Sequence, residues 1–93
     1  MNELTVRIKR RVKRRLGGEK PTVWIGKNRF SPEVLREIEK QLEKKEMVKI
    51  RILKSALQRD EAKGIASKIA QETSASLVEV RGHTFMLYKR RKK

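Results

Sequence analysis

Residues 23–53 read VWIGKNRFSPEVLREIEKQLEKKEMVKIRIL, and this stretch decides the fold. It opens with β-branched and aromatic residues, which predict a short strand over residues 22–25. It closes with an alternating run, residues 47–53, in which Val48, Ile50 and Ile52 share one face of a second strand. Between them, Ser31-Pro32-Glu33 is typical of a helix start, and the helix is predicted to run to about Lys45. A strand–helix–strand unit of this kind places two parallel strands in one sheet.

The sequence after residue 53 extends this unit. A third helix is predicted over residues 60–73, with an uncertain start and with Gly64 as either a weak point or a site of close packing. Its inward residues are Ile65, Ala66, Ile69 and Ala70. Two alternating runs then flank Gly82-His83, which fits a two-residue hairpin of type II′. We therefore expect both crossover helices on one sheet face, where they bury Val48, Ile50, Ile52, Val78 and Val80.

The N-terminal segment, residues 4–16, allows two interpretations. Apolar residues recur every four positions at Leu4, Ile8, Val12 and Leu16, which predicts a helix ending at Gly17-Gly18. The alternation Leu4-Val6-Ile8 would also suit a short strand, but the helical repeat covers more of the chain. In a helix, Arg7, Arg10 and Arg14 would lie away from the apolar stripe. The predicted class is α/β in the order α-β-α-β-α-β-β, with a four-stranded mixed sheet packed against three helices.

Composition narrows the range of functions. The 93 residues include 26 Lys and Arg against 11 Asp and Glu, a net charge of +15, which favours a polyanionic partner. Cysteine is absent and histidine occurs once, so a disulfide or a Cys/His zinc site is excluded. Catalysis is disfavoured because the acids lie mainly on one predicted helix, where lysines match them, and one histidine offers no pair. We expect one domain over residues 1–93 that is cytoplasmic and monomeric and has no cofactor or metal. We also expect no membrane partner, since no apolar run approaches the length of a membrane span.

The loop formed by Gly26, Lys27, Asn28 and Arg29 is the first candidate binding site. It lies between a strand and a helix N-terminus, where backbone N–H groups and the positive end of the helix dipole favour an anion. Gly26 allows backbone to approach a ligand closely, and the two cations add charge. An ordinary solvated turn is the alternative interpretation.

Further candidates lie on the helix, the tail and the sheet. Arg7, Arg10, Lys13 and Arg14 form a basic helix surface with no interleaved acids, and Lys89, Arg90 and Arg91 belong to a basic tail at about residues 89–93. The aromatic residues Trp24, Phe85 and Tyr88 could stack on bases or pack in the core. Lys49, Arg51 and Arg81 could form a basic sheet face or a simple solvated one.

These motifs together resemble the YhbY-like, or CRM (chloroplast RNA splicing and ribosome maturation), family over roughly residues 4–91. The resemblance rests on the Ile-Gly-Lys-Asn loop, on the helix before Met47-Val48-Lys49, and on Gly82-x-Thr84 leading to Leu87-Tyr88-Lys89. It implies a four-stranded mixed sheet with three helices, and RNA binding through a loop comparable to the Gly-x-x-Gly loop of KH domains. Stand-alone members are associated with precursors of the large ribosomal subunit, and fused plant members with intron splicing.

Arg29 stands where the family loop usually carries its second glycine. We expect the arginine side chain to replace a close backbone contact with phosphate, since a left-handed backbone is costly for arginine. The expected partner is ribosomal RNA of the large subunit or its precursor. Transfer RNA, intron RNA or DNA is the alternative, and an acidic membrane surface is a more distant one.

Overall fold

The computed structural model describes residues 5–26, 31–54 and 62–90. Within these residues it contains three helices and four strands: α1 (Val6–Leu16), β1 (Val23–Ile25), α2 (Pro32–Lys45), β2 (Met47–Ile52), α3 (Ala62–Glu72), β3 (Ser76–Arg81) and β4 (Thr84–Tyr88). The element order and the mixed sheet match the sequence prediction. The helical interpretation of the N-terminal segment is also confirmed over the residues described there.

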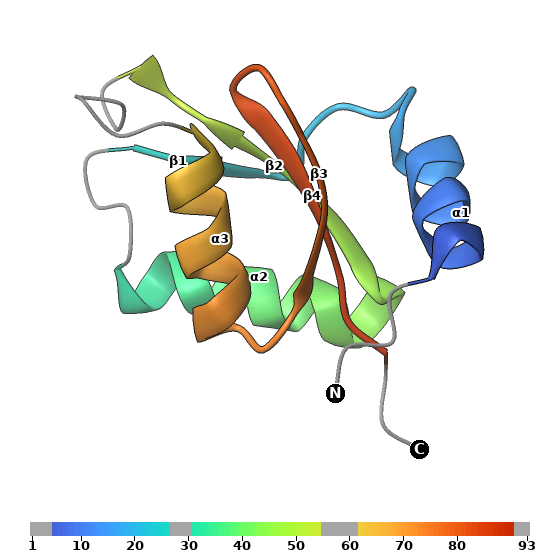
Figure 1. The fold of residues 1–93 in the computed structure, drawn as a ribbon. Coiled ribbons are helices and arrows are strands. Elements are labelled where there is room, and N and C mark those ends of the chain that lie inside the picture. The colour runs from blue at the N-terminus through green and yellow to red at the C-terminus, as the bar shows by residue number, and fades with distance from the viewer. Residues whose placement is uncertain (1–4, 27–30, 55–61, 91–93) are drawn as a thin grey trace.

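The four strands form one sheet in the order β1-β2-β4-β3. β1 is parallel to β2, with Val23 opposite Ile50 and Ile25 opposite Ile52. β4 is antiparallel to both β2 and β3. Figure 1 shows α1 on one side of this sheet and α2 and α3 on the other. The βαβ unit predicted from residues 23–53 thus forms one edge of the sheet.

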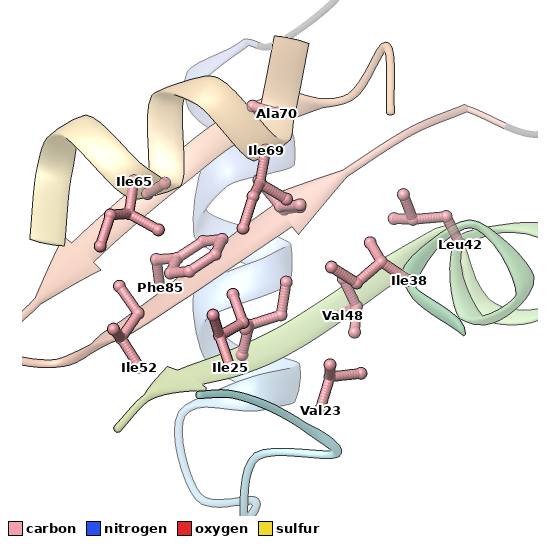
Figure 2. Close-up of a cluster of buried hydrophobic side chains, with 13 residues drawn as sticks. Val23, Ile25, Ile38, Leu42, Val48, Ile52, Ile65, Ile69, Ala70 and Phe85 are labelled. Atoms are coloured by element: carbon pink, nitrogen blue, oxygen red, sulfur yellow. The ribbon is translucent and has the colours of Figure 1, made fainter. Parts of the chain in front are cut away.

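The main core lies between the sheet and the crossover helices (Figure 2). Ile38 and Leu42 of α2 and Ile65 and Ile69 of α3 are buried there against the strands. Val48, Ile50 and Ile52 point into the same core, and Val80 packs against it. The prediction that both crossover helices share one sheet face is therefore confirmed.

Val78 is an exception, because it lies in the cluster under α1 rather than under the crossover helices. The ladder between β3 and β4 pairs Leu77 with Leu87 and then Glu79 with Met86, so Val78 is an extra residue in a β-bulge. A bulge shifts the alternation of a strand by one position. The prediction that Val78 and Val80 share a face was therefore wrong for Val78.

A second, smaller core holds α1 on the opposite face. Val12 and Leu16 of α1 are buried against Met47, Met86 and Tyr88 of the sheet, with Ile8 partly buried beside them; Val78 completes the cluster. Ile8, Val12 and Leu16 of the predicted stripe thus form the docking face of α1, and Leu4 lies outside the described residues. Each fully buried aliphatic side chain of this kind stabilises the fold by roughly 2 kcal/mol.

Local sequence determines where the helices begin and end. Thr5 caps α1 by accepting a hydrogen bond from the Ile8 amide at 3.2 Å, and Ser31 caps α2 by accepting one from the Val34 amide at 3.2 Å. α2 ends at Glu46, whose φ of 67° is left-handed. Gly64 in α3 is exposed, and a Cβ there would meet nothing within 4 Å. It is therefore a weak point of the helix rather than a site of close packing.

The β3–β4 hairpin closes through the two residues predicted for it. Arg81 pairs with Thr84, and Gly82 has a φ of 59°. Within the described residues, positive φ outside glycine occurs only at Glu46 and Ser74, so His83 has a negative φ. A positive φ followed by a negative one is the sign pattern of type II′.

Candidate nucleic-acid interface

The outward face of α1 carries three exposed arginines, Arg7, Arg10 and Arg14. Together with Val6 and Arg11 they line an open hollow of about 480 Å³. Among the residues that the structure describes, Arg7, Arg10 and Arg14 form no ion pair. Three cations along one helix face without acidic neighbours form a surface suited to phosphates.

Two other cations of α1 point toward the sheet instead. Lys13 Nζ lies 3.0 Å from Glu79 Oε1 on β3. Arg11 lies 3.7 Å from Glu46 and places its guanidinium 5.8 Å from the centre of the Tyr88 ring. Lys13, predicted as an RNA contact, thus also holds α1 on the sheet. Arg11 was not among the predicted residues; the available signal was its place three positions after Ile8, which puts it beside the apolar stripe of the helix.

The candidate loop begins at a well-placed strand end. Gly26 follows β1 and is half-buried, and Ser31 caps α2 on the other side of the loop. The strand–loop–helix frame predicted for this site is confirmed. Lys27, Asn28 and Arg29 lie outside the described residues, so their role as phosphate contacts stays a prediction.

The basic tail begins with a residue that packs against α3. Lys89 Nζ donates a hydrogen bond to the Thr73 carbonyl oxygen at 3.1 Å, just after the C-terminus of α3. The Lys89 amide donates to the Glu46 carbonyl at 2.9 Å. Arg90 is exposed, and Arg91 lies outside the described residues. Lys89 is therefore engaged with the fold, and Arg90 is the exposed residue of the described part of the tail.

The structure brings α1 close to Tyr88 at the end of β4 and places Gly26 at a distance from it. Arg11 of α1 covers the ring of Tyr88, the last residue of β4 before the tail. Gly26 instead follows Ile25, which pairs with Ile52 at the other end of β2 from Met47. Five residues of extended strand separate these ends by roughly 17 Å. Figure 1 shows the same separation between α1 and the C-terminal end of β1.

The three aromatic candidates, Trp24, Phe85 and Tyr88, differ in how exposed their side chains are. Phe85 lies in the main core with 1% of its surface exposed, and Tyr88 lies under α1 with 6% exposed. Trp24 is 53% exposed and points to the α1 side of the sheet, because its neighbours Val23 and Ile25 point into the main core. Of the three, only Trp24 is available to a base. His83 is exposed in the hairpin, where its carbonyl accepts a hydrogen bond from the Ile52 amide.

The sequence predicted a basic sheet face or a simple solvated one from Lys49, Arg51 and Arg81, and these three residues differ in their contacts. Lys49 Nζ donates to the carbonyl oxygens of Leu16 at 3.0 Å and Glu19 at 2.8 Å, so it holds the end of α1. Arg51 and Arg81 are exposed on the same face. Lys49 thus belongs to the packing of the protein, and the two arginines to its surface.

The described part of the chain offers no cluster of three or more His, Cys, Asp or Glu residues able to hold a metal ion. In the same residues, no helix has the length and apolar character needed to cross a membrane.

The fold and its basic face define a known class of domain. A family model for the CRS1/YhbY (CRM) domain matches residues 4–89, and the chain belongs to this family. The resemblance inferred from the loop and hairpin motifs is thereby confirmed.

Proteins of several organisms are similar to this chain. A protein of Methanocaldococcus jannaschii named "Probable RNA-binding protein" is 33% identical over 89 residues, which cover 96% of this chain and 66% of that protein. A Haemophilus influenzae protein named "RNA-binding protein" is 33% identical over 69 residues, covering 74% of this chain and 68% of that protein. The chain thus spans about two thirds of the length of these relatives.

The third comparison is with a solution structure. A hypothetical protein from Staphylococcus aureus, described as a candidate RNA-binding protein, superimposes with a TM-score of 0.77 at 27% sequence identity. The match covers 97% of this chain and 92% of that one, so it includes α1 as well as the sheet and both crossover helices.

Proposed function

We propose that this chain is a non-catalytic RNA-binding domain that acts on ribosomal RNA during assembly of the large subunit. The observation that carries RNA binding is the outward face of α1, where Arg7, Arg10 and Arg14 are exposed and unpaired among the described residues. Leaving three like charges on one helix face costs helix stability, and a polyanion relieves that cost.

Charge segregation supports this proposal. α2 carries the acids Glu33, Glu37, Glu39 and Glu43 among its bases, whereas α1 carries none. Among the described residues, a helix surface with cations and no interleaved acids is thus found on α1 and not on α2. A surface of one sign orients the domain on its partner as well as attracting it.

The choice of RNA as the polyanion is supported by the family and by the names of the two relatives. The choice of ribosomal RNA rests on the association of stand-alone family members with large-subunit precursors. Transfer RNA, intron RNA and DNA are the competing partners.

A competition assay tests the proposal. A labelled fragment of large-subunit ribosomal RNA containing both helices and loops is bound to the protein, then displaced in matched salt. The competitors are the unlabelled fragment, transfer RNA, and a DNA duplex of equal length. We expect the ribosomal fragment to compete at least tenfold better than the DNA duplex, since 2′-hydroxyl contacts distinguish RNA from DNA.

Equal competition by DNA would contradict RNA specificity, and stronger competition by transfer RNA would move the proposal to that partner. Crosslinking in cells followed by sequencing of the attached RNA then identifies the natural target. Recovery of large-subunit ribosomal RNA is the expected result, and recovery of other RNA classes alone would overturn the assembly role.

A further inference from the structure

Part of the sheet face that carries α1 is left uncovered by the residues that the structure describes. α1 packs on the rows that contain Met47, Met86 and Tyr88, and its C-terminal end is fixed by Lys49. The next row toward the Gly26 end runs across all four strands; it consists of Trp24, Arg51, Thr84 and Arg81 in hydrogen-bonded register. No residue of this row belongs to either core cluster.

The uncovered row joins an aromatic ring to two cations. Trp24 lies directly beside Arg51 in the parallel ladder, and Arg51 forms no ion pair among the described residues. Arg81 lies 3.4 Å from Glu79, but its side chain is 85% exposed. Because Glu79 is also paired with Lys13, the patch keeps a net positive charge.

A hollow of about 140 Å³ adjoins this row. It is lined by Gly17, Lys49, Glu79, Arg81, Thr84 and Met86, between the C-terminal end of α1 and the β3–β4 hairpin. Its walls offer the Thr84 hydroxyl and the Arg81 guanidinium, which are partners for the polar groups of a ribose or a base. An exposed indole, two arginines and a polar hollow on one surface favour a single nucleotide over an apolar partner.

We infer that Trp24, Arg51 and Arg81 form a stacking site for an unpaired RNA base on the open half of the sheet. The indole supplies the stacking face, and the arginines neutralise the phosphates on either side. The site lies between the α1 arginines and the Gly26 end of the sheet. A single-stranded segment leaving a helix bound at α1 would cross it. This inference rests on the proposed RNA binding. It adds that the protein binds an unpaired nucleotide of the RNA.

Trp24 is the only tryptophan of the sequence, so its fluorescence reports on this site directly. The unmodified protein is titrated with a single-stranded RNA of mixed sequence about 12 nucleotides long. Binding is followed in parallel by the anisotropy of a label on the RNA. We expect quenching of Trp24 emission to rise with the same midpoint as the anisotropy. A fully paired RNA duplex of similar length should bind without comparable quenching.

Variants separate stacking from simple burial. Trp24→Leu keeps an apolar side chain but removes the ring, and it should weaken binding of the single strand about tenfold. Trp24→Phe keeps a ring and should bind within about threefold of the parent. Arg51→Gln and Arg81→Gln should each weaken binding several-fold. The control is Lys68→Gln, which removes an equal charge from α3 on the opposite side of the sheet and should leave affinity unchanged.

The outcomes distinguish this inference from the proposed function. Two results together would overturn the stacking site and leave RNA binding intact. The first is normal RNA binding by Trp24→Leu, and the second is a parent protein whose Trp24 emission does not change when RNA binds. Failure of the parent protein to bind any RNA would overturn both. A Trp24 emission shift that depends on protein concentration without RNA would assign the patch to a second copy of the chain and would also overturn the inference.

Discussion

Three lysines show how individual side chains of this protein serve packing. Lys13 Nζ meets Glu79, Lys49 Nζ meets the end of α1, and Lys89 Nζ meets the Thr73 carbonyl. Their acceptors lie 16 to 66 positions away in the chain, beyond any helical or strand period. The sequence therefore shows which residues are cations, but it does not predict which of them form contacts within the fold. Lys13 and Lys89 stay predicted RNA contacts, because an ammonium group has three donors.

Ser74 provides a stability test at a single position. It ends α3 in a Schellman motif, in which the Ala75 amide donates to the Ala70 carbonyl and the Ser74 amide to the Gln71 carbonyl. Its φ of 57° is left-handed, a conformation that costs most residues roughly 1 kcal/mol and glycine little. We expect Ser74→Gly to raise the free energy of unfolding by about 0.5–1 kcal/mol in urea titrations.

Ser67 supplies the matched control, because it is exposed in the interior of α3. The same change there, Ser67→Gly, should lower stability by about 0.5 kcal/mol, since glycine is the poorer helix former. If Ser74→Gly and Ser67→Gly changed the free energy of unfolding in the same direction, the left-handed cap at Ser74 would be contradicted.

At the scale of elements, features set by neighbouring residues could be predicted from the sequence, whereas features set by packing between distant segments could not. The Ser31 cap follows from local sequence, and the βαβ unit follows from the strand-forming residues 22–25, the Ser-Pro-Glu helix start and the alternation over residues 47–53. The placement of Val78 does not, because the bulge opposite Met86 leaves no mark in the alternating pattern. Which sheet face α1 covers is equally hidden, since an apolar stripe predicts burial but does not identify the surface it packs on.

The attachment of α1 to the sheet can be tested at Lys49. This half-buried residue donates to three carbonyl groups, those of Leu16, Gly17 and Glu19, and so completes the end of α1. Lys49→Met keeps an unbranched side chain but removes the charged donor, which leaves these carbonyls without it. We expect a loss of about 1.5–3 kcal/mol in unfolding free energy. Hydrogen exchange should show the largest loss of protection in α1.

Arg51 lies two residues further along the same face of β2 and is exposed. Arg51→Met should therefore change stability by no more than about 0.5 kcal/mol. A comparable loss from both substitutions would mean that Lys49 acts through the sheet and not through α1.

At the scale of the whole molecule, the net charge of +15 is distributed unevenly. The acids are concentrated on α2, while α1 and the tail carry most of the unbalanced cations. Composition alone predicted the polyanionic partner, and the family was recognisable from the loop and hairpin motifs. The structure adds the separation between α1 and the Gly26 end, and the uncovered row around Trp24 between them.

This distribution predicts a strong salt dependence of RNA affinity. With about five phosphate contacts to single-stranded regions, a plot of log K against log salt concentration should have a slope near −3.5. The measurement is a series of binding isotherms on one ribosomal RNA fragment between low and physiological salt. An affinity that stays constant over this range would rule out binding dominated by phosphate contacts.

The most direct test of the central claim, that the outward face of α1 binds RNA, compares two triple variants of equal charge. One replaces Arg7, Arg10 and Arg14 with Gln, and the other replaces Arg36, Lys40 and Lys63, which are exposed on α2 and α3. Both proteins carry three positive charges fewer, so net charge cannot separate them. The α1 variant should lose at least tenfold in affinity, and its salt slope should become shallower by about two units. The α2/α3 variant should bind like the parent, and equal losses from the two variants would contradict the claim.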